Sequence, residues 1–304
     1  MKKTAWFGNL LLVFVAAIWG TAFVFQRVGM DKIEPITFNA SRMTLSAIVV
    51  GIVVLVRGRS SDRAAEEGIS LKRDIIGGVC CGVFLASASI FQQMGLVFTS
   101  AGKAGFITAM YMLLVPVIGF LFFKKRNPLI VWLAVALGVV GMYMLCITDG
   151  FSLEYGDSLV CVCALLFSGH ILCCDHFAGR GDPIRISAIQ FLTTAVISWT
   201  AAFIVESPTW AAIWEAFLPI AYCGIVSGGV GYTLQMVAQK HTDPTVASLL
   251  MSLESVFAVI AGALILEEMM SRREITGCAI MFAAIVIVQI GPYFVNKKSD
   301  VTHV

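Results

Sequence analysis

The chain has 304 residues, 59% of them hydrophobic and only 13% charged, and its formal net charge is +2. A water-soluble domain normally carries about 25% charged residues, so this composition excludes an ordinary soluble protein and predicts a chain that faces lipid. The small net charge, with no basic run interleaved with aromatic residues, argues against nucleic acid as a partner.

Apolar windows recur along the whole chain and are separated by short polar segments. About 20 apolar residues cross the hydrocarbon core of a bilayer as one helix. The pattern therefore predicts an all-α polytopic membrane protein with about ten transmembrane helices. The expected spans are residues 6–26, 36–56, 75–98, 103–123, 128–147, 156–175, 184–205, 212–236, 244–266 and 275–295.

The distribution of positive charge predicts how the chain is oriented. If the N-terminus is cytoplasmic, the inside segments hold fifteen of the 21 lysines and arginines and the outside segments hold five. Cytoplasmic loops carry an excess of these residues. We therefore expect a multi-pass protein of the cytoplasmic (inner) cell membrane, with both termini in the cytoplasm.

The two halves of the chain resemble each other. A displacement of 142 residues brings Gly82 onto Gly224 and Gln93-Met94 onto Gln235-Met236. We expect one five-helix repeat over residues 1–150, a second over 151–298 and a short cytoplasmic tail over 299–304. Five crossings leave the chain on the opposite side, so the repeats must be inverted, which is common in secondary transporters with a site between the repeats.

Characteristic sequence blocks occur in order along both halves. The first half contains Trp19-Gly20-Thr21-Ala22-Phe23, Phe91–Leu96 and Thr99–Thr108, and the second contains Gln235–Lys240 and Ser252–Phe257. Together these blocks resemble the EamA-type proteins of the drug/metabolite transporter superfamily. The resemblance covers essentially the whole chain. It implies ten helices, movement of small metabolites, and proton or exchange coupling. Ser255 stands where that family often has proline, so the proline-induced helix break is not expected here.

Three ionisable residues that lie well inside predicted spans, Glu254, Arg42 and His170, stand out, because burial there is costly and suggests function. Glu254 lies about 15 Å into the ninth span by the helical rise, near the midplane. It could carry a proton or pair with a cationic substrate, or it could be a structural carboxyl bonded to a neighbouring helix. Arg42 lies roughly 9 Å into the second span. It could snorkel outward, anchor the helix to a carbonyl, or hold an anionic group.

Other polar and aromatic residues deep in the spans are candidates for a central binding site. His170 could take part in a proton relay, or it could simply hydrogen-bond a backbone carbonyl. Gln93 and Gln235 match across the repeat, so we expect them to line the central cavity together, although glutamines also bridge helices in lipid. Trp19, Tyr111 and Tyr232 offer amphipathic rings for a ligand, with ordinary helix packing as the alternative.

The cysteines and the remaining motifs give no sign of catalysis or of a cofactor. Cys161-x-Cys163, His170 and Cys173-Cys174 contain soft metal ligands, but their spacing does not match a structural zinc site, and we expect no metal. A phosphate loop, an H-E-x-x-H motif and a nucleophile elbow are all missing from the sequence. We therefore expect neither an enzyme nor a bound cofactor.

The sequence as a whole predicts a secondary active transporter that works by alternating access. Export of amino acids or related compounds, with optional proton coupling, follows from the resemblance alone. Uptake or exchange of a nucleotide-like or cofactor metabolite is one alternative, and an intramembrane enzyme or sensor is another. The expected partners are a small-molecule substrate and the lipid bilayer, and nothing in the sequence indicates a homodimer.

Overall fold

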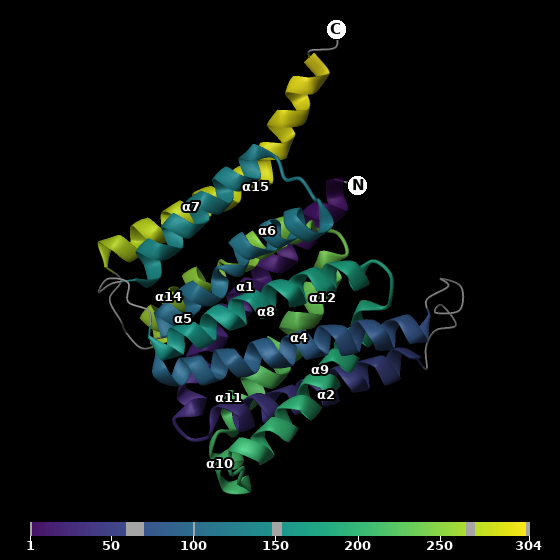
Figure 1. Cartoon of the computed structure of the whole chain (residues 1–304), viewed down its shortest axis with the longest axis vertical. Helices are drawn as coiled ribbons and strands as arrows, with labels where there is room; N and C mark the ends of the chain where they lie inside the picture. Colours follow the sequence, from purple (N-terminus) through teal and green to yellow (C-terminus); the bar gives the residue numbers. More distant parts are fainter. Residues whose placement is uncertain (1, 59–69, 100, 148–153, 266–270, 302–304) are drawn as a thin grey trace.

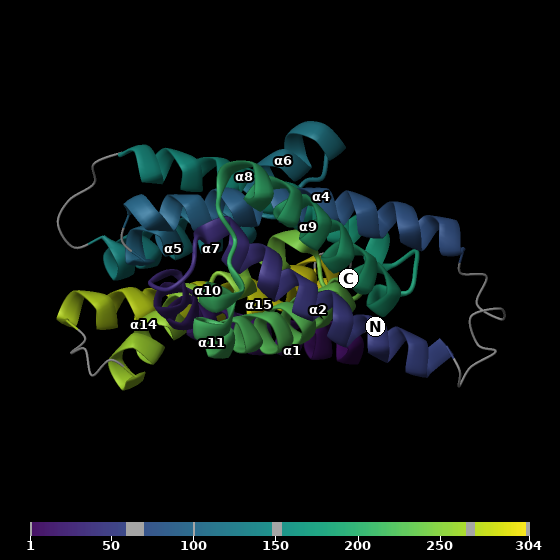
Figure 2. The same cartoon turned by 90° about the horizontal axis from the view of Figure 1, so that it is seen from below.

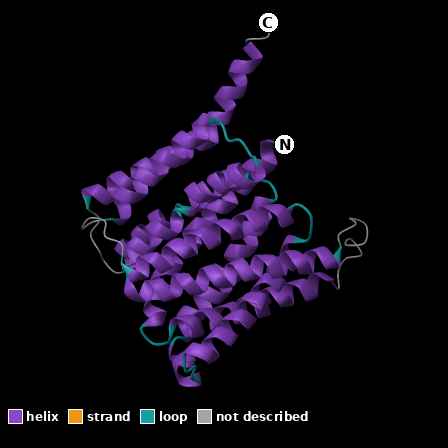
Figure 3. Cartoon of the chain, viewed as in Figure 1, coloured by secondary structure: helices purple, strands orange, loops and turns teal. Residues whose placement is uncertain are grey.

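Helices make up nearly all of the described chain (Figures 1 and 3). The computed structural model describes residues 2–58, 70–99, 101–147, 154–265 and 271–301, and no strand occurs within them. The elements are α1 (Lys2–Met30), α2 (Pro35–Gly58), α4 (Leu71–Phe98), α5 (Ala101–Ala109), α6 (Tyr111–Phe123), α7 (Leu129–Cys146), α8 (Tyr155–Ala178), α9 (Pro183–Val205), α10 (Trp210–Glu215), α11 (Phe217–Ala221), η1 (Tyr222–Tyr232), α12 (Thr233–Gln239), α13 (Pro244–Met251), α14 (Glu254–Ile265) and α15 (Arg272–Val301).

The helices agree with the predicted membrane spans. Among the described residues, eight segments are long and apolar enough to cross a membrane, and Leu129–Leu145 is a shorter apolar helix. Each predicted span coincides with a helix or with a run of consecutive helices. The prediction of an all-α polytopic membrane protein is therefore confirmed, with ten as an approximate number of crossings.

The helices lie side by side in one bundle (Figure 1). Helices α7 and α15 pack against each other along one edge, and α2 packs against α9 near the opposite edge. Figure 2 shows α4 and α8 on one side of the bundle and α1 and α14 on the other. The start of α1 and the end of α15 lie at the same end of the bundle, as an even number of crossings requires.

Helices α2 and α9, one from each half, are tied together at both ends. The Glu206 carboxylate, directly after α9, accepts hydrogen bonds from the backbone N–H groups of Ile36 (2.8 Å) and Thr37 (2.7 Å). These N–H groups belong to the first turn of α2, where no partner exists within the helix. At the other end, Arg57 of α2 lies 3.6 Å from the carboxylate of Asp182, which caps α9. The contacts at the two ends therefore join the halves in a similar way.

Two spanning segments are interrupted at positions related by the repeat. The first break falls at Met110, between α5 and α6, and the second at Ser252, between α13 and α14. These positions are 142 residues apart, which is the displacement of the repeat. The Ser252 hydroxyl donates to the Leu249 carbonyl (2.7 Å), a local bond that favours bending of a helix. The second break therefore forms even though Ser255 replaces the proline.

The eighth span contains a wide π-helical segment, η1, which packs closely on α2. A Cβ atom on Gly224 would lie 2.8 Å from the carbonyl oxygen of Arg42, closer than side chains pack. The Ser46 hydroxyl donates to the Gly224 carbonyl at 2.6 Å. Glycine thus lets the two backbones touch, and this contact fixes the part of α2 that carries Arg42.

Candidate functional site

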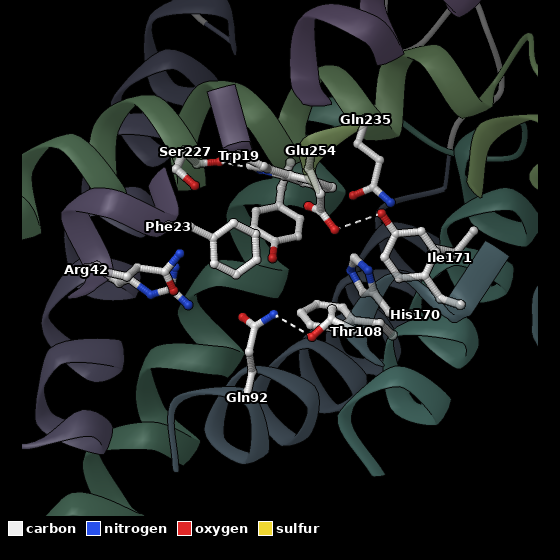
Figure 4. Close-up of a pocket in the computed structure, with 14 residues that line it drawn as sticks. Trp19, Phe23, Arg42, Gln92, Thr108, His170, Ile171, Ser227, Gln235 and Glu254 are labelled. Carbon is white, nitrogen blue, oxygen red and sulfur yellow. Dashed lines mark hydrogen bonds between the residues drawn. The ribbon is translucent and has the colours of Figure 1, made fainter. Parts of the chain in front are cut away.

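A buried cavity lies between the two halves, beside both helix breaks (Figure 4). Its volume is about 40 Å³, which is room for about one or two water molecules. Both repeats contribute side chains, so any relative movement of the halves would change its size. It is lined by Trp19, Phe23, Gln26, Arg42, Gln92, Thr108, Tyr111, Phe167, His170, Ile171, Ser227, Tyr232, Gln235 and Glu254.

Glu254 and Tyr111 meet in this cavity. Each begins a helix directly after a break, Tyr111 at the start of α6 and Glu254 at the start of α14. The Tyr111 hydroxyl donates a 2.9 Å hydrogen bond to the Glu254 carboxylate. The tyrosine hydroxyl therefore gives the Glu254 carboxylate a hydrogen-bond partner inside the membrane.

Arg42 enters the same cavity from α2 and is 2% exposed. Its Nε and Nη2 atoms donate to the side-chain oxygen of Asn39 at 3.0 and 2.9 Å. Asn39 in turn donates to the hydroxyls of Ser89 (3.0 Å) and Ser198 (2.9 Å). These contacts hold the guanidinium inside the bundle by a side-chain network. Of the three roles considered from the sequence, an outward path and a carbonyl partner are not what the described residues show, and the binding of an anionic group is left as a prediction.

Arg42 and Glu254 line one cavity without forming an ion pair. Tyr111 is the hydrogen-bond partner of Glu254, and Asn39 is that of Arg42, within the part of the chain that the structure describes. Figure 4 shows Arg42 reaching in from one side, with Glu254 on another. The cavity therefore brings together a guanidinium and a carboxyl group, each available to a third molecule.

Aromatic rings also line the cavity. The rings of Trp19 and Tyr232 are 4.6 Å apart, and the Tyr232 and His170 rings are 5.8 Å apart. Trp19 Nε1 donates to the Ser227 carbonyl at 3.1 Å. Ser227 lies within η1, and a π-helical segment presents backbone carbonyls differently from an α-helix. The wide turn thus provides the acceptor that orients the indole.

His170 lines the cavity but its partners are not those considered from the sequence. Its Nε2 atom lies 3.1 Å from the side-chain oxygen of Gln190 and 3.4 Å from Cys174 Sγ. The histidine is thus held by side chains of α8 and α9. A relay role would need a proton donor or acceptor from the cavity to reach the same ring.

The two repeat-related glutamines occupy different positions. Gln235 lines the cavity and donates a hydrogen bond to the side-chain oxygen of Gln239 at 3.0 Å. Gln239 in turn donates to the Ile171 carbonyl at 3.0 Å. Gln93 does not line the cavity. It is fully buried and donates to the side chain of Gln26, which does line it. The structure therefore places Trp19, Tyr111, His170, Tyr232, Gln235 and Glu254 around the cavity, together with Arg42, and Gln93 one residue behind it.

Several lining residues were not singled out from the sequence. Phe23 and Gln26 follow Trp19 at the i+4 and i+7 positions of α1, so the helical period alone could have indicated them. Thr108 precedes the break at Met110 by two residues. Its place in the cavity lining could not be predicted, because no sequence signal marks that break.

The cysteines of α4 and α8 cluster beside His170. Cys81 Sγ lies 3.4 Å from Cys173 Sγ and 3.9 Å from Cys174 Sγ. Across the described residues, no group of three or more His, Cys, Asp or Glu side chains has a geometry suited to a metal ion.

Comparison with known proteins supports the relationship suggested by the sequence blocks. The model of the EamA-like transporter family matches residues 6–147 and 154–290, one match in each half. Among solved structures, one crystal structure superposes with a TM-score of 0.76 at 18% identity and covers 93% of this chain and 96% of that chain. This similarity shows a shared fold.

Relatives at the sequence level cover almost the full chain. An uncharacterized transporter of Archaeoglobus fulgidus is 27% identical over 93% of this chain and 86% of its own length. The uncharacterized inner membrane transporter YedA of Escherichia coli is 22% identical over 98% of this chain and 95% of its own. The uncharacterized transporter YoaV of Bacillus subtilis is 20% identical over 90% of this chain and 94% of its own length. All three are named as transporters, and none of these names gives a substrate.

Proposed function

Because the chain belongs to the EamA-like transporter family, we propose that it is a secondary active transporter that moves a small metabolite through the cavity between its halves. One observation carries the proposal. Arg42 and Glu254 line the same buried cavity, and in the described part of the chain neither is the ion-pair partner of the other. Burying such groups in a membrane is costly, and a solute that pairs with both would offset the cost.

The chemistry of these two groups favours a zwitterionic solute. A guanidinium binds a carboxylate through a planar fork of donors, and an ionised carboxyl binds an ammonium. Arg42 would take the carboxylate of an amino acid, Glu254 its amino group, and the Trp19 and Tyr232 rings would contact the side chain. Amino acids and closely related compounds therefore fit the cavity best.

Competition at Glu254 would couple transport to protons. The ionised carboxyl holds an ammonium group, whereas the protonated form can hold it only weakly. Solute and proton would therefore occupy Glu254 in turn, which gives an exchange of one for the other. In a cell whose exterior is more acidic than the cytoplasm, protons entering through this exchange would drive the solute outward. Export is thus the direction that the proposed coupling favours.

Two glutamine contacts would close the cavity towards its two ends. The contact of Gln93 with Gln26 joins α1 to α4 near the C-terminal ends of those helices, at the edge of the cavity that Gln26 lines. Gln239 joins α12 to the Ile171 carbonyl in the direction of the opposite end. Alternating access requires that one closure opens while the other holds. A cavity of about 40 Å³ is too small for an amino acid, so binding would require the halves to separate.

The alternatives receive less support from the cavity. Arg42 is the one lysine or arginine that lines it within the described residues, whereas a nucleotide-like metabolite with several phosphate charges would need more cationic partners. An intramembrane enzyme or sensor would need a nucleophile and a base placed together, and the named relatives are transporters.

Flux in proteoliposomes tests the proposal. Vesicles with the wild-type chain are loaded with labelled amino acids, nucleotides or polyamines, and a pH gradient is then imposed. We expect an amino acid to leave faster when protons flow inward, and the gradient to have no effect in Glu254→Gln. Glu215→Gln, an exposed carboxyl on α10, is the control. Undiminished gradient-driven flux in Glu254→Gln would remove Glu254 from the coupling.

A further inference from the structure

A larger hollow lies at the surface of the bundle between α4, α6 and α8. It shares no lining residue with the central cavity and has a larger volume. Its volume is about 1020 Å³. Its walls are mostly apolar, and Phe122 and Phe123 at its rim are 75% and 68% exposed. We call it the lateral groove, and define it by Phe84, Ile118, Phe122, Phe123, Leu172 and Phe177.

One end of the lateral groove carries charged side chains. Lys125, Asp175, His176 and Arg180 line it there. Lys125 also pairs with Asp243 at 2.7 Å. Arg180 donates through Nη1 to the His176 carbonyl at 2.9 Å, and the same atom contacts the His176 ring nitrogen Nδ1. The groove thus combines an apolar wall with an end where two permanent cations, Lys125 and Arg180, lie beside Asp175, and where Lys125 is also paired with Asp243.

The depth of the groove corresponds to one leaflet of a bilayer. Its walls belong to three segments that are long and apolar enough to cross a membrane. Gly169, at its deep end, lies about 14 Å from the end of α8 at Ala178 by the helical rise. The hydrocarbon core is roughly 30 Å thick, so one leaflet is about half of that. The charged end, just beyond Phe123 and Ala178, therefore lies at the level of lipid headgroups.

Glycine contributes to the open floor of the groove. A Cβ atom on Gly119, which lines the groove from α6, would meet no other atom within 4 Å. Larger side chains could be accommodated there without a clash, so packing inside the protein does not require glycine at this position. Because glycine has no side chain, this position leaves space in the groove for a molecule that is not part of the protein.

We propose that the lateral groove binds an anionic phospholipid of the leaflet on the positively charged side. One acyl chain would lie along Phe84, Phe122 and Leu172, and the phosphate would meet Arg180 and Lys125. Basic pockets between transmembrane helices are suited to anionic headgroups in this way. The lipid lies against α6 of the first repeat and α8 of the second, so it contacts both halves. This site does not depend on which solute the central cavity carries.

Lipid retention by the purified full-length chain tests the proposal. Protein in mild detergent is mixed with phosphatidylglycerol or phosphatidylcholine of the same acyl chains. Bound lipid is counted by native mass spectrometry, and the shift in Tm is recorded. We expect phosphatidylglycerol to be retained about tenfold or more over phosphatidylcholine. Arg180→Gln should abolish that preference, and Gly119→Leu, which fills the floor, should reduce retention of both lipids.

Matched controls separate the groove from general effects of charge and size. Lys240→Gln removes a cation from an exposed position outside the groove, and Gly51→Leu fills an equally open glycine on α2. Both should bind lipid as the wild type does. Equal retention of the two lipids by the wild type, or an unchanged preference in Arg180→Gln, would overturn the proposal. So would a wild-type dimer that Gly119→Leu converts to a monomer, because a second copy would then fill the groove.

Discussion

The Tyr111 hydroxyl donates a 2.9 Å hydrogen bond to the Glu254 carboxylate, and the two residues begin α6 and α14, the helices that follow the two repeat-related breaks. The contact joins the first repeat to the second at the wall of the central cavity. It also means that the carboxyl group on which the proposed coupling depends is oriented by a residue of the other half.

Tyr111→Phe should therefore weaken solute binding without unfolding the chain. A hydrogen bond to a charged group contributes about 1.5–3 kcal/mol, so we expect solute affinity to fall about tenfold and the pH dependence of flux to move. Tyr143→Phe, on α7 and away from the cavity lining, is the control. Equal affinity and an unchanged pH profile in Tyr111→Phe would show that Glu254 does not depend on this contact.

Gly224→Ala should destabilise the contact between η1 and α2. The new methyl group would lie 2.8 Å from the Arg42 carbonyl, and overpacking of this kind costs about 1–3 kcal/mol. Gly229→Ala in the same π-helix is the control, because its nearest neighbour would be 3.4 Å away. The measurement is Tm in detergent for both variants. Equal losses in the two would mean that glycine is needed for the π-helix itself and not for close approach.

Glu206→Ala should loosen the join between the halves. It leaves the Ile36 and Thr37 N–H groups without their acceptor, and loss of a helix cap costs about 1–2 kcal/mol. Glu215→Ala, at an exposed position, removes the same charge elsewhere. We expect a lower Tm in Glu206→Ala alone. A Tm equal to that of the wild type would show that water satisfies these groups as well as Glu206 does.

Gln93→Leu and Gln239→Leu should open opposite ends of the cavity. Each removes one hydrogen bond between helices, worth about 1 kcal/mol, so populations should shift about fivefold. Gln239→Leu also removes the bond that Gln239 accepts from Gln235 within α12. The probe is Phe23→Cys in a chain without other cysteines, labelled by an impermeant thiol reagent from either side of the membrane. We expect Gln93→Leu to raise labelling from one side and Gln239→Leu from the other. The same change from both would contradict their assignment as two separate closures.

The sequence predicts the spans because lipid requires long apolar helices, and the ten expected segments all coincide with helices. It also points to Glu254, because an acid within an apolar span is conspicuous. It could not predict that Arg42 would bind Asn39, or that Gln93 would bind Gln26 behind the cavity. The Gln93–Gln26 pair depends on how two helices rotate against each other, and Arg42 binds Asn39 one turn away on the same helix because Ser89 and Ser198 of other helices hold Asn39 in place. The π-helical turn likewise depends on packing against α2. Its glycines allow the two backbones to approach closely but do not by themselves specify that packing.

The most direct test of the central claim is to bind a zwitterion and its two half-analogues to the purified protein. Once an amino acid ligand is found, its decarboxylated amine and its deaminated acid are compared in wild type, Arg42→Gln and Glu254→Gln by ligand-induced thermal shift. A ligand at 100 times its Kd adds about 2.7 kcal/mol of stability. We predict that Arg42→Gln weakens the amino acid and the acid but not the amine, and that Glu254→Gln weakens the amino acid and the amine but not the acid. If both variants weaken the binding of all three ligands equally, or if neither variant weakens the binding of any of them, Arg42 and Glu254 do not recognise the two ends of the solute.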